Sequence, residues 1–214
     1  MSNEQEFVDA FEQNNQEQLL KYSDKVNWNY ISEYQKLSEK FIEKYSDKVY
    51  WGDISKYQML SEEFIGKYSD KVCWGYISKY QKLSEEFITA HNLKIEDSNW
   101  LYKDNQYKLN FLKNLGLYEI VDDKYIIAYK SCRGNGYSKY NFQYKYEMGN
   151  EYTSHCDCTG AEDSFGLSAW TKEKAIEYCK EKLLKVKINI EDIGIVVHEG
   201  GKIRCRKLTV LSEE

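Results

Sequence analysis

Tyr22-Ser23-Asp24-Lys25-Val26-Asn27-Trp28 is the first of three copies of one motif, and the other two begin at Tyr45 and Tyr68. Each copy starts 23 residues after the one before it and continues as Ile-Ser-x-Tyr-Gln-x-Leu-Ser-Glu-x-Phe-Ile. A fixed period of this length is typical of stacked repeats, in which each unit buries its apolar face only against a neighbour. The motif therefore predicts a helical array from Tyr22 to about Ile88.

Two short helices are predicted in each copy. In the first copy Trp28, Ile31 and Tyr34 recur at helical spacing. Ser38 then offers a hydroxyl that can cap a second helix. Leu37 and Ile42 flank that cap at the spacing of a hydrophobic staple. Because the three signals agree in phase in every copy, we expect three helix pairs. We also expect the repeat tryptophans to lie in the core between stacked helices.

Further helices are predicted at both ends of the array. Glu6–Leu20 has apolar positions suited to closing the first repeat, and residues 99–114 are helical up to Gly116, where a left-handed cap is favoured. We therefore assign residues 1–116 to a helical repeat domain with caps.

From Leu117 the apolar period becomes that of strands, which predicts a second, α+β domain over residues 117–214 with a mainly antiparallel sheet. One amphipathic helix is expected at Thr171–Leu183, with Ala175 and Ile176 in its buried stripe. The expected strands are Leu117–Val121, Tyr125–Lys130, Phe142–Tyr146, Glu151–Ser154, Leu184–Ile190, Ile193–His198 and Ile203–Leu211.

The composition excludes some functions. A net charge of -5, from 30 basic and 35 acidic residues in a mixed pattern, argues against generic nucleic-acid binding, which needs a basic face. No apolar run approaches the length of a membrane span, and the acidic N-terminus does not resemble a secretion signal. We expect a cytosolic protein whose six cysteines are reduced.

Cations and aromatic side chains gather in two parts of the second domain. Tyr129, Lys130, Arg133 and Tyr137 surround a glycine-rich loop. Arg204 and Arg206 alternate near the C-terminus, so on one strand they would project from one face. Guanidinium groups bind phosphate and aromatic rings stack on bases, which indicates a site for a small anionic ligand. The plainer interpretation is that these residues cover a solvated strand face.

His155-Cys156-Asp157-Cys158 is the densest group of metal-ligand types. Zinc needs four ligands, and no second Cys-x-x-Cys pair is present to complete a site. We therefore expect a polar loop with two reduced thiols and no bound metal. The sequence also shows no base-orienting partner for a cysteine nucleophile, and we expect neither catalytic residues nor a cofactor.

Two resemblances cover most of the chain. The Tyr-Gln-x-Leu-Ser-Glu-x-Phe-Ile repeats resemble those of phage, giant-virus and some bacterial proteins. The segment from Tyr125 to Leu211, with Cys132-Arg133-Gly134 and the turn at Gly149, resembles an uncharacterised domain of phage and prophage proteins. Together they imply a phage or mobile-element context, in which small proteins often counteract host defence.

A third resemblance is local. Ser164-Phe165-Gly166-Leu167-Ser168-Ala169-Trp170, followed by Tyr178 and Cys179, is similar to the phenylalanine-glycine strand and following helix of ADP-ribosyltransferase-like folds. The resemblance implies that aromatic rings such as Phe165 and Trp170 hold the nicotinamide end of a dinucleotide. The catalytic glutamate pattern of that family has no counterpart in this chain.

The sequence as a whole favours a non-catalytic binding protein. It would capture a small anionic, nucleotide-like ligand or a host protein, and so interfere with defence signalling. The repeats would serve as a scaffold or as a surface for homo-oligomers. Two alternatives stay open, an NAD-using enzyme with an ADP-ribosyltransferase-like fold and a purely structural protein-interaction module. The predicted ligand-binding residues are Tyr129, Lys130, Arg133, Tyr137, Phe165, Trp170, Arg204 and Arg206.

Overall fold

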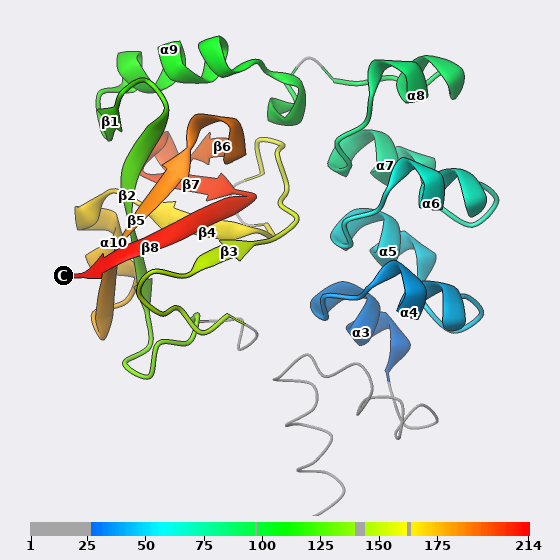
Figure 1. Cartoon of the computed structure of the whole chain (residues 1–214), viewed down its shortest axis with the longest axis horizontal. Helices are drawn as coiled ribbons and strands as arrows, with labels where there is room; N and C mark the ends of the chain where they lie inside the picture. Colours follow the sequence, from blue (N-terminus) through cyan, green and yellow to red (C-terminus); the bar gives the residue numbers. More distant parts are fainter. Residues whose placement is uncertain (1–26, 97, 140–143, 162–163) are drawn as a thin grey trace, which may run out of the picture. The chain divides into compact units, whose positions relative to one another are not determined.

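The structure is a computed structural model that describes residues 27–96, 98–139, 144–161 and 164–214. Its internal contacts divide the chain into two units, Met1–Ile95 and Glu96–Glu214. The first unit contains paired helices and the second an antiparallel sheet with short helices, so the predicted α+β fold class is confirmed (Figure 1). The predicted helix Glu6–Leu20 lies outside the described residues.

Each repeat in the described part of the first unit forms the two expected helices. Ser38 caps the second helix of its pair by accepting a hydrogen bond from the backbone N–H of Phe41, and the serines before the two equivalent helices do the same. The helices are α3 (Trp28–Tyr34), α4 (Glu39–Lys44), α5 (Trp51–Tyr57), α6 (Glu62–Lys67), α7 (Trp74–Tyr80) and α8 (Glu85–Ala90).

A row of fully buried isoleucines forms the core of the array, with one residue from each of four successive helices. Burying such a side chain contributes roughly 1.5–3 kcal/mol. These residues are Ile42, Ile54, Ile65 and Ile77. The apolar positions of the repeat are therefore sufficient to hold the helices in a stack.

The repeat tryptophans are half-buried and pack against the apolar core of the array, and Trp51 packs against two successive core clusters, in agreement with the predicted position between stacked helices. The ring of Trp51 lies 6.2 Å from that of Phe64 in its own repeat and 5.0 Å from that of Tyr68, the first residue of the next repeat. Its indole N–H donates to the carbonyl of Ser46 at 2.9 Å. The polar edge of the indole thus holds it at the turn before the helix, and the fully buried positions go to isoleucine.

A buried glutamine joins each repeat to the preceding one. Gln58 donates to the carbonyls of Ser32 and Gln35, at 2.8 and 2.7 Å, and accepts from the N–H of Leu37 at 2.9 Å. Gln81 makes the same three bonds one repeat later. These backbone groups belong to the last turn of a helix and the segment after it, where intrahelical partners run out. The glutamines therefore satisfy backbone groups that are hidden from water.

The second unit begins with two helical segments, η2 (Trp100–Tyr102) and α9 (Asn105–Leu115). Gly116 ends α9 with φ of 68°, as its predicted role as a left-handed cap requires. Lys108 of α9 donates to the carbonyl of Ile193 at 2.7 Å, and Leu112 is fully buried in the core of this unit. We had placed the domain boundary at residue 116. The units instead divide between Ile95 and Glu96, because α9 packs on the sheet.

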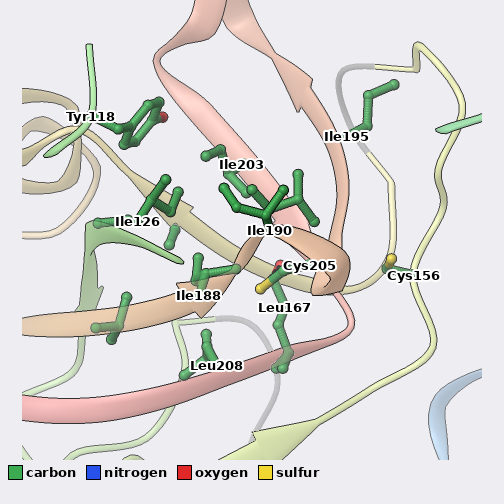
Figure 2. Close-up of a cluster of buried hydrophobic side chains, with 14 of the residues drawn as sticks. Tyr118, Ile126, Cys156, Leu167, Ile188, Ile190, Ile195, Ile203, Cys205 and Leu208 are labelled. Atoms are coloured by element: carbon green, nitrogen blue, oxygen red, sulfur yellow. Dashed lines mark hydrogen bonds between the residues drawn. The ribbon is translucent and has the colours of Figure 1, made fainter. Parts of the chain in front are cut away.

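Eight strands form one sheet in the order β3-β8-β5-β2-β4-β7-β6, with β1 paired to β2. Strands β1 and β2 pair antiparallel, and so do β6 and β7. The strands are β1 (Glu119–Val121), β2 (Tyr125–Cys132), β3 (Glu151–Thr153), β4 (Leu167–Trp170), β5 (Lys182–Asn189), β6 (Ile193–Val197), β7 (Lys202–Cys205) and β8 (Lys207–Glu213). Two single-turn segments, η3 (Ile190–Asp192) and η4 (His198–Gly200), connect the strands around β6. Side chains from several strands meet in one apolar core, part of which is drawn in Figure 2.

The predicted helix Thr171–Leu183 is shorter in the structure. Helix α10 spans Lys172–Tyr178, and the chain is extended at Cys179. Leu183 lies in β5, which pairs with β2 along its whole length, and Ile176 is exposed instead of buried. Eight residues of strand pairing override the local helical pattern, which is the usual effect of tertiary contacts on weak helix propensity.

Two predicted strands also differ. Ile203–Leu211 is not continuous, because at Arg206 the chain leaves its β4 and β6 neighbours and joins β3 and β5. The backbone N–H of Arg206 donates to Asp192, outside the strand ladder. In the predicted strand Phe142–Tyr146, the described part contributes only an isolated bridge between Lys145 and Tyr137.

None of the helices in the described ranges combines the length and the apolar character that a bilayer span requires.

Candidate functional site

Three of the predicted binding residues meet where β2 joins β4. Tyr129 is paired with Trp170 across the two strands. The Lys130 ammonium donates to the carbonyl of Ser168 at 2.8 Å. It also lies 5.2 Å from the ring centre of Trp170 and 4.9 Å from that of Tyr146. The structure thus brings Tyr129, Lys130 and Trp170 together.

Lys130 is almost completely buried, at 5% exposure. The pKa of Lys130 is lowered to about 8, chiefly by burial and to a smaller extent by the nearby Lys202, while Cys205 and Cys132 act in the opposite direction. The two rings and the carbonyl compensate in part for the lost hydration of the ammonium group. Lys130 therefore acts mainly inside the fold, as a donor between β2 and β4.

Arg133 and Tyr137 belong to the loop that follows β2. The Arg133 guanidinium donates to the carbonyl of Lys139 at 2.9 Å, and the Arg133 backbone N–H donates to Tyr137. The Lys139 ammonium donates in turn to the carbonyl of Tyr178 and lies 4.6 Å from its ring. Since Tyr178 stacks on Trp170 at 4.4 Å, this loop connects to the β4 cluster through α10.

Arg204 does not take part in that cluster. Its side chain is fully buried, and its guanidinium donates to the carbonyls of Thr159 and Ala161. One of its nitrogens lies 3.6 Å from a carboxylate oxygen of Asp157, which is also buried. The prediction of Arg204 as a phosphate ligand does not fit this arrangement, because its guanidinium is buried against the loop that precedes β4.

The other two predicted residues also lie apart. Arg206 donates to the carbonyl of Glu191 at 3.3 Å, and Phe165 stacks on His155 at 5.5 Å. Arg206 lies beyond the end of β7, so the alternation that was expected to align it with Arg204 is interrupted. The guanidinium groups of Arg133, Arg204 and Arg206 thus have separate carbonyl partners and do not form the anion cluster that the sequence suggested.

The His155-Cys156-Asp157-Cys158 segment forms part of the loop before β4. Within the described ranges, no group of three or more His, Cys, Asp or Glu side chains is arranged to hold a metal ion. Asp157 accepts hydrogen bonds from the backbone and hydroxyl of Thr159 and faces Arg204. The carboxylate therefore has a structural role in that loop.

The first unit presents a row of exposed aromatic side chains that the sequence did not single out. We call Tyr30, Tyr34, Tyr50, Tyr57 and Tyr76 the tyrosine face. Four of the five are 39–53% exposed, and Tyr57 is half-buried. They belong to α3, α5 and α7, except that Tyr50 is the residue before α5.

Local contacts link these rings along the array. Tyr30 and Tyr34 are 4.5 Å apart. The Lys56 ammonium lies 4.6 Å from the Tyr57 ring and 6.0 Å from the Tyr76 ring. A side chain at Gly52 would meet both Tyr50 and Tyr76, at 3.3 and 3.9 Å. The absence of a side chain at that position leaves room for the two rings.

The two rows of helices differ in charge. The row of α3, α5 and α7, with the segments that follow each helix, carries more lysines than acids. The row of α4, α6 and α8 carries six glutamates, two in each helix, against three lysines, two in α4 and one in α6. The charged residues of the first row are Glu33, Lys36, Asp53, Lys56, Lys79 and Lys82. The tyrosine face thus lies on the more basic row.

One signal in the sequence could have identified this face. Stacking requires the same residue at each core position, as with the isoleucines, but it places no such demand on the outer positions. Tyr30 and Tyr76 correspond to Asp53, and Tyr50 corresponds to Asn27 and Cys73. Large aromatic residues at positions where the copies differ are not explained by stacking.

Comparisons of the chain with protein-family models, with curated proteins and with solved structures found no match. The resemblances to phage proteins and to ADP-ribosyltransferase-like folds therefore stay predictions from the motifs that carry them.

Proposed function

We propose that this is a non-catalytic binding protein whose helical array holds a protein partner on the tyrosine face. The observation that carries the proposal is the linked row of exposed tyrosine rings on one side of the array. Tyrosine is enriched in protein interfaces and among the residues that dominate binding energy, because it offers a large contact area and a polar end. An exposed aromatic patch of this kind is typical of an interaction site.

The partner that fits is an acidic protein segment. Lysines outnumber acids four to two on the tyrosine row, whereas the opposite row has the reverse excess. Electrostatic complementarity of this kind accelerates association and selects among partners. With the resemblance to phage proteins, the partner would be a host factor involved in defence.

The array is also suited to binding because its backbone is held in place before a partner arrives. The buried glutamines cross-link successive repeats, and Ser32 accepts a hydrogen bond from Tyr50 N–H of the next repeat at 3.0 Å. A preorganised surface loses less conformational entropy on binding. Tyr50 in particular is fixed at its backbone while its ring stays exposed.

A small anionic ligand is supported less well than a protein partner. The predicted arginines lie on separate carbonyls, and Arg204 is enclosed. Lys130 and Lys139 both donate to backbone carbonyls. Most of the cationic groups that we assigned to phosphate binding instead donate hydrogen bonds to backbone carbonyls of the second unit.

Selection of peptides on the full chain tests the proposal. A displayed library of random peptides is selected on the immobilised protein, and the selected peptides are synthesised with a fluorescent label. We expect acidic peptides with apolar or aromatic residues. The variant Tyr30→Ala/Tyr76→Ala should weaken their binding by about tenfold or more, as expected for interface tyrosines.

Tyr107→Ala is the matched control, because Tyr107 is equally exposed but lies in α9 of the second unit. It should leave binding unchanged. Selection of basic peptides, of no peptides, or of peptides that bind the double variant as well as the wild-type protein would contradict the proposal.

A further inference from the structure

Two thiols in the loop before β4 lie in direct contact. The sulfur atoms of Cys156 and Cys158 are 3.3 Å apart, and both residues are fully buried. The Cys158 thiol also lies 3.5 Å from the carbonyl of Cys156. A disulfide requires a separation of about 2 Å. The two sulfur atoms are thus in contact but not bonded.

Two glycines create the space that this pair occupies. A side chain at Gly194 would lie 2.5 Å from the Cys156 sulfur and 2.9 Å from the Cys158 sulfur. A side chain at Gly166 would lie 2.4 Å from the Cys156 Cβ, with φ at that glycine of 126°. Any larger residue at either position would displace the thiols. The fold therefore keeps room for both sulfur atoms between the loop and β6.

The other cysteines are arranged differently. Cys205 lies at the end of β7, paired with Leu167 of β4, and its sulfur lies 3.6 Å from the Leu167 carbonyl oxygen. Cys179 donates to the carbonyl of Cys132 at 3.2 Å. All six cysteines are free in the structure. The thiols of Cys205 and Cys179 thus contact backbone carbonyls, whereas the thiols of Cys156 and Cys158 contact each other.

We propose that Cys156 and Cys158 form a reversible disulfide, which makes this loop a redox-sensitive element. Formation of the S–S bond removes two protons and two electrons from the thiols. A low-molecular-weight disulfide such as oxidised glutathione accepts the electrons in two exchanges. In the first exchange, one protein thiolate attacks that disulfide and releases one glutathione thiolate. In the second, the other protein thiolate attacks the mixed disulfide and releases the second glutathione thiolate.

The bond would act on a loop that anchors a buried charge. Asp157, between the two cysteines, faces the guanidinium of Arg204. The carbonyl of Cys158 accepts from the N–H of Trp100, which connects the loop to η2. Oxidation would therefore fix the loop that holds Arg204 and η2, and reduction would leave it free to open. Opening is necessary for the reaction itself, since both thiols are hidden from solvent.

The pKa of Cys156 agrees with a slow exchange. Its hydrogen bond with Cys158 and its burial raise that pKa well above the ordinary range. Because the thiolate is the attacking species, oxidation should accelerate as the pH rises. Cys73 is half-exposed in the first unit and should react with glutathione sooner, as a mixed disulfide.

Mass spectrometry of the folded, full-length protein tests the inference. The chain is incubated with excess oxidised glutathione, the remaining thiols are alkylated, and the disulfides are mapped by proteolysis. We expect a peptide that contains Cys156 and Cys158, has lost two hydrogen atoms and carries the bond between these residues, and we expect dithiothreitol to reverse the change. Absence of that bond in the folded wild-type protein, or its formation only in denaturant, would overturn the proposal.

Cysteine variants sharpen the result. Cys158→Ser should abolish the intramolecular bond, while Cys73→Ser and Cys179→Ser should leave its yield unchanged. An oxidised product that maps to Cys132 and Cys179 instead would also overturn the assignment. Since the mapping on the wild-type protein needs no substitution, a folding defect in Cys158→Ser does not weaken the test.

Discussion

Burial decides what charged side chains do in the second unit. Lys130 and Arg204 were predicted to hold an anion, and both direct their donors at backbone carbonyls inside the fold. Transfer of such a group from water is costly unless hydrogen bonds or an opposite charge compensate. Arg204 has the carboxylate of Asp157 nearby, whereas Lys130 has two aromatic rings and a carbonyl. Burial lowers the pKa of Lys130 to about 8.

Lys130→Met should change how the stability of the protein depends on pH. The pKa of Lys130 is about 8 in the folded protein, against 10.5 for an unperturbed lysine. Between these two values the unfolded chain binds the extra proton, so this group makes folding more favourable as the pH rises. Below the lower value both states are protonated, and the full cost of the buried charge is present.

The variant should therefore gain stability relative to the wild-type protein near neutral pH and lose that advantage at higher pH. The difference in unfolding free energy between the variant and the wild-type protein should change by about 3 kcal/mol between about pH 7 and about pH 10. Urea unfolding of both proteins measures it, and the tyrosines and cysteines that titrate in this range are common to both. A stability difference that does not vary with pH would show that Lys130 is not buried as described.

Helices and strands differ in how far local sequence determines them. In the repeats the helix period, the serine cap and the hydrophobic staple agree, and all six described helices follow the expectation. In the second unit, the residues that end α10 and that divide β7 from β8 are set by partners far away in sequence. No residue near Leu183 or Arg206 marks, by its type alone, the end of the predicted helix Thr171–Leu183 or a break in the predicted strand Ile203–Leu211. A single sequence does not show which strands pair, and in this unit the pairing decides where these elements end.

The glutamine ladder is the element-level feature most open to mutation. Gln58→Leu leaves two carbonyls and the N–H of Leu37 without the partner they have in the wild-type protein. Each buried backbone group that loses its partner costs roughly 1–3 kcal/mol. Amide hydrogen exchange at Leu37 should accelerate by at least about a hundredfold, which corresponds to about 2.7 kcal/mol.

Gln106→Leu is the control for this substitution, because Gln106 is exposed and bonds only to Asn110 in its own helix. Gln81→Leu should reproduce the effect at Leu60, one repeat later. Unchanged exchange at Leu37 in the Gln58 variant would mean that the ladder does not hold the repeats together.

At the scale of the whole molecule, the two units differ in which side chains they leave exposed. The array offers a row of exposed tyrosines on a cross-linked backbone, whereas the second unit encloses Lys130, Arg204 and four of its five cysteines. The sequence indicated a binding protein with a repeat scaffold. It did not identify the exposed tyrosines that the proposed function uses, because exposure depends on which residues the stack leaves outside. That information follows from the packing of the isoleucines and tryptophans, and not from residue type.

The most direct test of the account is to locate a bound partner on the array. An acidic peptide obtained by selection is made with a photoreactive group and cross-linked to the full chain, and the attachment points are mapped by mass spectrometry. The account predicts attachment within residues 27–37, 50–60 and 73–83, the segments of α3, α5 and α7. Attachment mainly to α4, α6 and α8, or to the second unit, would contradict it.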